Sequence, residues 1–261
     1  MIFNKKLITN KIELLEYQYD ILELFRTSFN AELDKEIWKW AYIDNICGNP
    51  IVSLYFHNDK LIGHYAIIPM RLNFNSNNLL AALSMTTMVD INYRRHGIFI
   101  QQATEVYEKA KTLGFSLVYG FPNLKSAPGF KKRLDWTIDT QSYVIRIQGK
   151  YLINKKIKSE NKICLDFQDK EFLKWRLSKP NQEYIKKDYF VLKKFDDAFD
   201  IVYHEFNFLD IEKENYYNLL VDESDGYQNE KEFEYLFGYK IFDDKLIGFE
   251  FKKDLIMSDV F

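Results

Sequence analysis

At 261 residues, with 47% hydrophobic and 17% aromatic side chains, the chain can bury a sizeable core, which excludes a disordered protein. The 36 Lys and Arg residues nearly balance the 38 Asp and Glu residues, and the net charge of −2 excludes a global positive field that would attract nucleic acid. We therefore expect one large or two small folded domains and no nucleic-acid partner.

The chain shows no sign of export or of a metal centre. Its N-terminal segment carries charges every few positions and lacks the apolar run of a signal peptide. No stretch reaches the roughly 18 uninterrupted apolar residues of a membrane span. The two cysteines, Cys47 and Cys164, and four scattered histidines predict neither a disulfide framework nor metal ligands. We expect a cytoplasmic protein with reduced thiols.

The first predicted elements are two helices followed by three strands. Residues 12–29 place apolar side chains at helical spacing between charges. Asp34 is a candidate N-cap for a second helix over residues 36–42. Alternating apolar runs and turn residues then predict strands at residues 51–56, 61–69 and 80–92.

A basic turn closed by Gly97 separates the third strand from a helix. The turn is Arg94-Arg95-His96-Gly97-Ile98, and apolar residues at helical spacing follow it. Backbone N–H groups at the start of a helix attract anions, and a glycine lets a phosphate approach the backbone closely. The segment therefore predicts a phosphate-binding strand, turn and helix.

A second set of elements comes after this helix. Residues 115–120 form a compact apolar run that predicts a strand, and Phe121-Pro122-Asn123-Leu124-Lys125-Ser126 then leads toward a short helix. Residues 140–148 predict a final strand. Helices and strands in this order predict a mixed α/β sandwich.

The two motifs together resemble the GNAT acetyltransferase superfamily over about the first 150 residues. Arg94 and Gly97 match its acetyl-CoA pyrophosphate loop, Arg/Gln-x-x-Gly-x-Gly/Ala, while Phe99 stands where that family prefers a small residue. Asn123 and Ser126 match its later Asn-x-x-Ala/Ser motif. Asp135-Trp136 occupies the place of a Gly-Phe pair, with one extra residue.

The resemblance implies an α/β fold of the GNAT type, a mixed and mostly antiparallel sheet flanked by helices. It also implies that acetyl-CoA is the cosubstrate, that no metal is needed, and that the strand beginning near Phe115 diverges from its neighbour to admit the cosubstrate. The cofactor-binding residues implied in this way are Met88, Val89, Arg94, Arg95, His96, Gly97, Ile98, Phe99, Asn123 and Ser126.

Three residues are candidates for the proton transfers of acetyl transfer. Asp90 is the acidic residue nearest the end of the third strand and could serve as the base, or it could cap the next turn. Tyr93 and Tyr119 could protonate the leaving thiolate, because a phenol titrates near 10 and above a thiol. By resemblance the usual acid is a tyrosine on the helix after Asn123, where this chain has Phe130.

The chain becomes rich in Lys and Asn over residues 150–162, which predicts a boundary between a GNAT domain at 1–150 and a smaller α/β domain at 151–261. The second part is predicted to contain strands at 189–193 and 200–206 and a helix at 211–220. It also repeats two segments of the first part, since residues 171–175 resemble 36–40 and residues 244–248 resemble 59–63. Because the two offsets differ, either a degenerate GNAT-like domain or convergent hairpin chemistry explains the repeats.

The sequence therefore predicts an acetyl-CoA-dependent N-acetyltransferase acting on a small amine. By analogy within the family, the first candidate acceptor is an amino sugar of surface polysaccharide biosynthesis. One alternative is a tandem-GNAT aminoacyl transferase of the peptidoglycan-bridge type, against which the near-neutral charge counts. Another is a non-catalytic acyl-CoA-binding or scaffold protein. The sequence does not indicate an oligomeric state.

Overall fold

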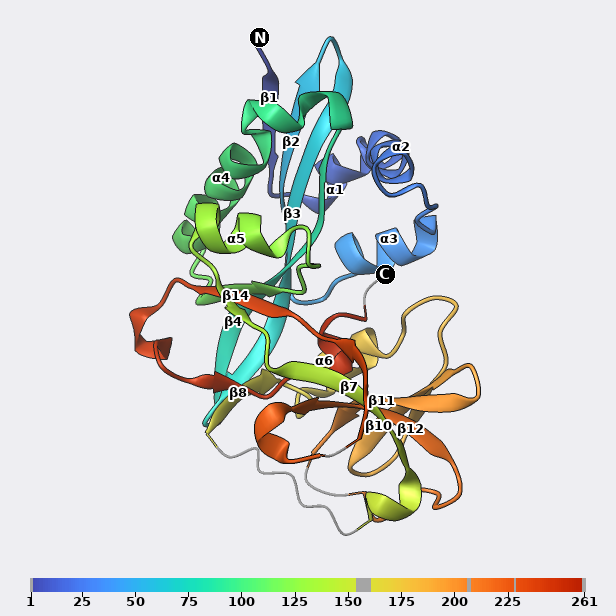
Figure 1. Ribbon diagram of the computed structural model, residues 1–261. Coiled ribbons are helices and arrows are strands. Elements are labelled where there is room, and N and C mark those ends of the chain that lie inside the picture. The colour runs from blue at the N-terminus through green and yellow to red at the C-terminus, as the bar shows by residue number, and fades with distance from the viewer. Residues whose placement is uncertain (1, 154–160, 206–207, 228, 260–261) are drawn as a thin grey trace.

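The computed structural model describes residues 2–153, 161–205, 208–227 and 229–259, which form two β-sheets and the helices around them (Figure 1). The first sheet has nine strands, with the path β1-β2-β3-β4-β5-β14-β6, while β8 pairs with β3 and β15 pairs with β8. The second sheet has six strands in the order β13-β7-β12-β11-β10-β9.

The strands and helices have well-defined bounds. The strands of the first sheet are β1 (Asn4–Ile8), β2 (Ile51–His57), β3 (Lys60–Phe74), β4 (Asn77–Val89), β5 (Leu117–Gly120), β6 (Thr137–Asp139), β8 (Lys162–Leu165), β14 (Phe237–Ile241) and β15 (Glu250–Phe251). Those of the second sheet are β7 (Ser142–Gln148), β9 (Tyr184–Lys186), β10 (Phe190–Phe195), β11 (Ala198–His204), β12 (Tyr216–Asp222) and β13 (Lys231–Glu234). The α-helices are α1 (Lys11–Leu15), α2 (Gln18–Phe29), α3 (Lys35–Tyr42), α4 (Ile98–Thr112), α5 (Ala127–Leu134) and α6 (Lys170–Arg176). The 3-10 helices are η1 (Ile91–His96), η2 (Gly149–Tyr151), η3 (Glu223–Asp225), η4 (Asp244–Leu246) and η5 (Leu255–Met257).

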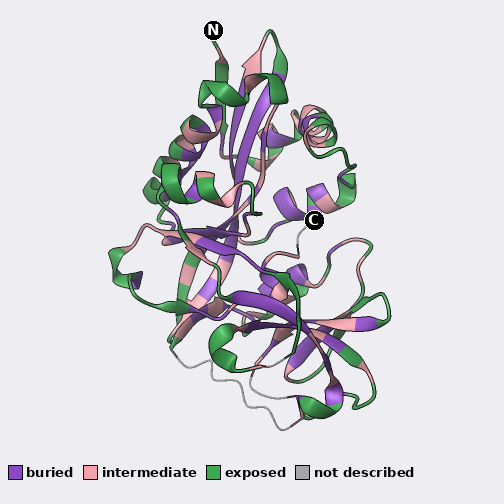
Figure 2. Ribbon diagram, in the orientation of Figure 1, coloured by how far each residue is buried: buried purple, intermediate pink, exposed green. Residues whose placement is uncertain are grey.

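Helices cover both faces of the first sheet, which makes its long central strand β3 almost wholly buried (Figure 2). Because successive side chains of a strand point to opposite faces, Tyr65 and Ile67 join the core beneath α4 and α5, whereas Ala66 and Ile68 join the core beneath α1, α2, α3 and α6. The result is the mixed, mostly antiparallel α/β sandwich that the sequence predicts.

The N-terminal helices agree closely with their sequence signals. Asp34 caps α3, since its Oδ1 accepts hydrogen bonds from the backbone N–H of Glu36 at 2.7 Å and of Ile37 at 3.3 Å. The single helix predicted over residues 12–29 is instead two helices, because Tyr17 leaves the helical conformation and α2 begins after it. Periodicity does not detect this break, since the apolar side chains on both sides still reach the same core.

The later predicted elements have different outcomes. The strand predicted over residues 140–148 is confirmed as β7, which belongs to the second sheet; β14, from a distant part of the chain, lies next to β5. The helix predicted over residues 211–220 is wrong, because residues 216–220 belong to strand β12. Tyr217, Leu219 and Val221 alternate into the core of the second sheet in the two-residue period of a strand.

The predicted boundary between domains, at residues 150–162, falls partly on residues 154–160, which lie outside the described residues, and it remains a prediction. Beyond it the chain contributes to both sheets, since β8, β14 and β15 belong to the first. Ile163, Phe172 and Trp175 also enter the core beneath α1, α2 and α3. The two parts of the chain therefore share one packed core.

Candidate active site

The predicted phosphate turn has the geometry of an anion site. Gly97 lies between η1 and α4 with φ +70°, a left-handed conformation that glycine adopts without steric cost. The backbone N–H groups of Ile98 and Phe99 begin α4 and therefore have no partner within the helix. Arg94 and Arg95 are exposed beside them. Two free N–H groups, the positive end of a helix and two cations together favour a phosphate group.

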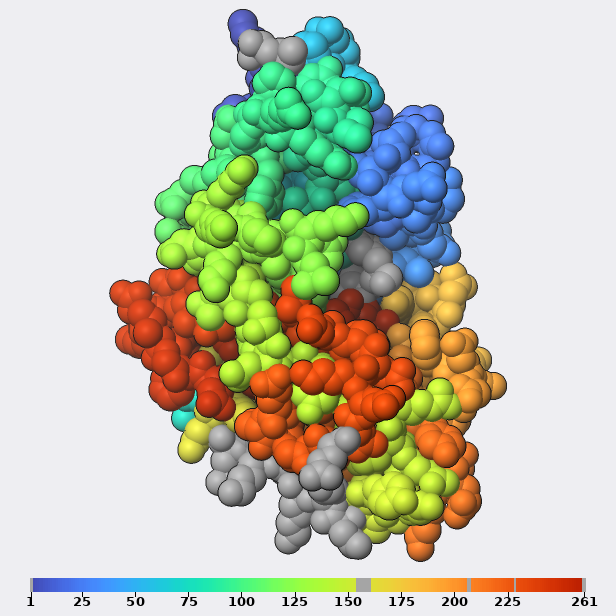
Figure 3. Space-filling model, viewed as in Figure 1, coloured from blue at the N-terminus to red at the C-terminus, as the bar shows by residue number. Residues whose placement is uncertain are grey.

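Strands β4 and β5 separate next to this turn. Their parallel pairing ends at Leu83 and Tyr119, whereas β4 continues to Val89. A Cβ atom on Gly120 would lie 3.1 Å from the backbone oxygen of Ser84. The two strands can therefore lie this close at the start of the fork because residue 120 has no side chain. Beyond the fork this edge of β4 has no strand partner among the described residues, and its backbone groups can bind a ligand. The surface is hollowed between the green turn, the yellow-green start of α5 and the blue helices (Figure 3).

A β-bulge lies in β4 just beyond the fork. His64 pairs with Met88 and Ala66 with Met85, so that Tyr65 of β3 faces both Thr86 and Thr87 of β4. Thr86 has φ +48°, which is unusual for a β-branched residue and costs about 1–3 kcal/mol. The bulge is not predictable from the sequence, because nothing in the pair of threonines indicates the extra residue.

Tyr119 stands at the fork on the side of α3. Its side chain is fully buried, and its hydroxyl has no hydrogen-bond partner among the described residues. Burial raises the pKa of Tyr119 far above its usual range, so the phenol keeps its proton at neutral pH. A neutral hydroxyl without a partner among the described residues can donate a hydrogen bond to a group bound at the fork.

The other two catalytic candidates occupy different surroundings. Asp90 binds Lys60 at 2.8 Å and accepts from the backbone N–H of Asn92 at 3.0 Å, so it caps η1. Partial burial favours its neutral form, but these contacts outweigh burial and lower the pKa of Asp90. The hydroxyl of Tyr93 lies 2.8 Å from His57 Nδ1 in a separate small cluster. The structure thus brings neither residue to the partner-free hydroxyl of Tyr119.

The second motif shapes the start of α5. Asn123 Oδ1 accepts from the backbone N–H of Lys125 at 3.0 Å and of Ser126 at 2.9 Å, which forms the turn before the helix. Two of the departures from the family pattern contact each other, because the rings of Phe99 and Phe130 lie 5.1 Å apart in an edge-to-face arrangement. Phe99 therefore packs inward, away from the space above the phosphate turn.

A groove of about 590 Å³ lies elsewhere, between the β3–β4 turn and the second sheet; its lining includes Asp166, Phe167, Tyr203 and Lys252. No group of metal-ligating side chains occurs among the residues that the structure describes. Within the same residues, no helix is long and apolar enough to cross a membrane.

Comparison with known proteins identifies the first part of the chain. Residues 15–138 match the family model of an acetyltransferase (GNAT) domain. The chain therefore contains a GNAT acetyltransferase domain, as the two motifs predict. No curated protein matches the sequence.

Solved structures show the same fold over nearly the whole chain. A probable N-acyltransferase of unknown function from Enterococcus faecalis has a TM-score of 0.63 at 11% identity, covering 93% of this chain and 73% of its own. A GCN5-related N-acetyltransferase from Kribbella flavida has a TM-score of 0.66 at 12% identity, with coverages of 92% and 72%. A putative acetyltransferase from Pyrococcus horikoshii has a TM-score of 0.51 at 12% identity, with coverages of 92% and 89%.

Proposed function

We propose that the protein transfers an acetyl group from acetyl-CoA to the amine of a small molecule. The observation that carries this proposal is the fork between β4 and β5, which lies next to the Gly97 turn and holds the partner-free hydroxyl of Tyr119. The turn would bind the pyrophosphate, and the edge of β4 up to Met88 and Val89 would bind the pantetheine arm. The fork would hold the thioester.

In this arrangement the amine nitrogen attacks the thioester carbonyl and the carbon–sulfur bond breaks. Tyr119 donates a hydrogen bond to the developing negative charge, and the proton lost by the amine passes through water to the leaving thiolate, which becomes a thiol. Because Asp90 has a lowered pKa and is bound to Lys60, we assign it to capping η1 rather than to accepting this proton. The products are an amide and free CoA.

An amino sugar remains the first candidate acceptor. The helices α2 and α3 border the hollow on the far side of the fork (Figure 3). The aromatic side chains Trp38 and Tyr42 of α3 are fully buried, so this choice of acceptor rests on analogy within the family. The peptidoglycan-bridge alternative requires an aminoacyl-tRNA, and a net charge of −2 disfavours that polyanion.

The test is CoA release from acetyl-CoA with a panel of hexosamines, nucleotide-linked amino sugars and aliphatic amines. Tyr119→Phe should lower kcat about 10- to 100-fold and leave CoA affinity, measured by calorimetry, within about twofold. CoA binding without turnover on any amine would favour the non-catalytic acyl-CoA-binding alternative. Failure to bind CoA would exclude both.

A further inference from the structure

Two buried side chains hold the bulge of β4 from the side of α3. His64 Nδ1 lies 2.7 Å from the carbonyl oxygen of Thr86, so this nitrogen carries the proton and donates it. The hydroxyl of Tyr42 bonds to Thr86 Oγ1. Both side chains are fully buried, and their rings meet edge to face at 6.3 Å. The carbonyl and the hydroxyl of one strained residue are therefore each fixed by a separate element.

The bonds of His64 and Tyr42 to Thr86, which we call the clamp, determine the direction of the backbone N–H of Thr87. In a trans peptide the C=O and the N–H of the next residue lie in one plane and point in opposite directions. Because His64 fixes the carbonyl of Thr86, the N–H of Thr87 points away from His64. The residue added by the bulge also disturbs the β3–β4 ladder at this position. An N–H at the fork that is not used by the ladder can donate to a ligand.

We propose that His64 and Tyr42 are positioning residues that hold the Thr86–Thr87 peptide so that its N–H is directed at the acyl oxygen of the bound thioester. This inference rests on the proposed function. Backbone donors aimed at a developing negative charge are among the largest contributions to acyl transfer, but only when their direction is fixed beforehand. Thr86 does not adopt its left-handed conformation readily, and the two bonds supply that constraint.

His64 does not fit the role of proton acceptor. Burial outweighs its bond to Thr86 and lowers the pKa of His64 to about 4. An alkyl ammonium titrates near 10, so transfer of its proton to this imidazole is strongly unfavourable. His64 Nε2 has no hydrogen-bond partner among the described residues, and the side chain is sealed from solvent. Removing His64 should therefore change the rate without moving the pH profile.

The experiment compares three variants with one control. His64→Leu removes the donor, His64→Asn keeps an N–H that can reach the same carbonyl, and Tyr42→Phe removes only the hydroxyl. Tyr55→Phe is the control, because this tyrosine is equally buried but bonds to Glu105, at 2.9 Å, away from the fork. For each variant, kcat, the KM for acetyl-CoA, the pH profile and amide hydrogen exchange of residues 84–89 are measured.

We expect His64→Leu to lower kcat about 10- to 100-fold while the KM for acetyl-CoA stays within about threefold. His64→Asn should recover most of this loss, and Tyr42→Phe should cost about 3- to 10-fold. Both His64→Leu and Tyr42→Phe should speed exchange of residues 84–89, whereas Tyr55→Phe should not.

Three results would overturn the proposal. They are an unchanged kcat in folded His64→Leu, equal rates in the Leu and Asn variants, or a shifted pH profile, which would make His64 a proton acceptor. If His64→Leu does not fold, His64→Asn and Tyr42→Phe still decide. Exchange in the free protein reports on the clamp even if no amine is turned over. A failure of the clamp can thus be distinguished from a failure of the proposed acetyl transfer.

Discussion

The unit α3–β2–β3 and the unit α6–β10–β11 have the same plan and different uses. Each begins with an aspartate that caps its helix, Asp34 in one and Asp169 in the other. Each continues through a proline-containing segment, which in the second unit includes the short strand β9, into an antiparallel hairpin. Trp40 and Trp175 stack with ring centroids 5.2 Å apart. Each indole N–H donates to the backbone oxygen of the other tryptophan, at 3.0 and 3.3 Å. This exchange of identical bonds is the pattern of a local two-fold axis.

The two units differ in the segments that come after their hairpins. The first continues into the long strand β4 with its bulge, the Gly97 turn and α4. The second continues into the short strand β12, and the described residues after it contain no glycine turn that opens an α-helix. The helix and hairpin are therefore a scaffold that both units share, and the candidate site belongs to segments that only the first unit has. We propose that the second unit is a degenerate repeat.

The largest effect is expected from breaking the stacked tryptophans. Trp40→Ala and Trp175→Ala should each lower the free energy of unfolding by about 3–5 kcal/mol, because each removes a buried ring and one indole hydrogen bond. Urea unfolding measures both. If the two tryptophans stabilise each other through one shared contact, the double variant should lose less free energy of unfolding than the sum of the two single losses. A purely additive loss would contradict the pairing.

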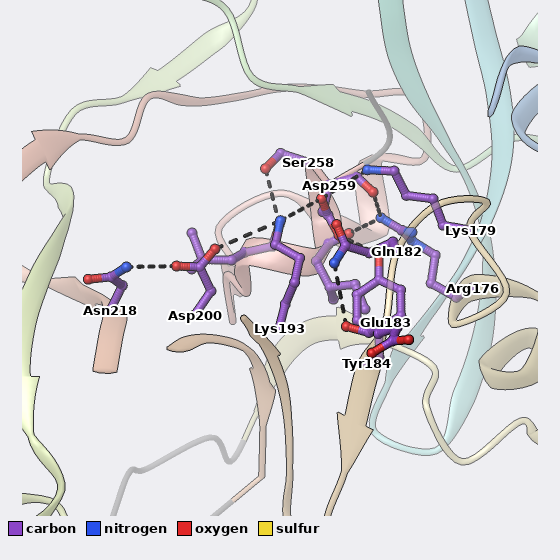
Figure 4. A network of polar contacts seen from close by, with 12 residues as sticks. Arg176, Lys179, Gln182, Glu183, Tyr184, Lys193, Asp200, Asn218, Ser258 and Asp259 are labelled. Carbon is purple, nitrogen blue, oxygen red and sulfur yellow. Dashed lines mark hydrogen bonds and ion pairs between the residues drawn. The ribbon is translucent and has the colours of Figure 1, made fainter. Parts of the chain in front are cut away.

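A smaller effect is expected from Asp259, which ties the C-terminal segment to the second unit (Figure 4). Its carboxylate accepts from Lys179 at 3.1 Å, Lys193 at 3.0 Å and Tyr184 at 2.5 Å. Burial alone would raise its pKa, but the charges of Arg176, Lys179 and Lys193 outweigh burial and hold the pKa of Asp259 far below its usual range.

Because this folded-state pKa is lowered, the contribution of Asp259 to stability is complete above the unfolded value of about 4 and is lost as the pH falls below it. Asp259→Asn should cost about 3 kcal/mol at pH 7, since it leaves buried cations without their anion, and should flatten the acid limb of the stability profile. Urea unfolding between pH 3 and pH 7 is the measurement, with exposed Asp197→Asn as control. An equally steep acid limb in the Asp259 variant would contradict the assignment.

The Gly97 turn tests whether the site belongs to the first unit alone. Gly97→Val places a branched side chain at φ +70° and beside the N–H groups that open α4. Calorimetric affinity for CoA should fall by about 1–3 kcal/mol, the value of one or two charged hydrogen bonds. Wild-type protein should bind one equivalent of CoA per chain. Unchanged affinity in the folded variant, or two equivalents in the wild type, would contradict this division of roles.

The smallest effect is expected from Asp90→Asn. An asparagine keeps an oxygen that can cap η1, and the ion pair with the largely exposed Lys60 contributes little. The rate should stay within about threefold of wild type when it is measured at several pH values. A loss of 100-fold or more would restore Asp90 as the proton acceptor.

The sequence is informative wherever the cause of the structure is local. The Asp34 cap and the turn closed by Gly97 depend on residues only a few positions apart. The likeness between residues 36–40 and 171–175 can likewise be read from two short segments of sequence. The likeness between residues 59–63 and 244–248 does not extend to structure, because the first is a hairpin turn and the second is the single turn η4.

The remaining features depend on contacts between distant segments. Nothing near β5 indicates that β14 will pair with it. The sequence of β12 is also compatible with a helix, and its strand conformation follows from the packing of alternate side chains into the core of the second sheet. The conformation of Thr86 depends on His64 and Tyr42, which lie on two other elements. Such features become visible only when the fold is known, and they include the residues that we assign to orienting the acyl group.

The pairing of β14 with β5 also has a consequence for how the protein is made. The two strands are about 120 residues apart in the chain, so at about 5–20 residues per second a ribosome needs roughly 6–24 s to deliver the second after the first. During that interval a growing chain exposes the hydrogen-bonding edge of β5 beside the half-built site. An open strand edge is a template for pairing with other chains. The nascent protein should therefore depend on chaperones most strongly before residue 241 emerges.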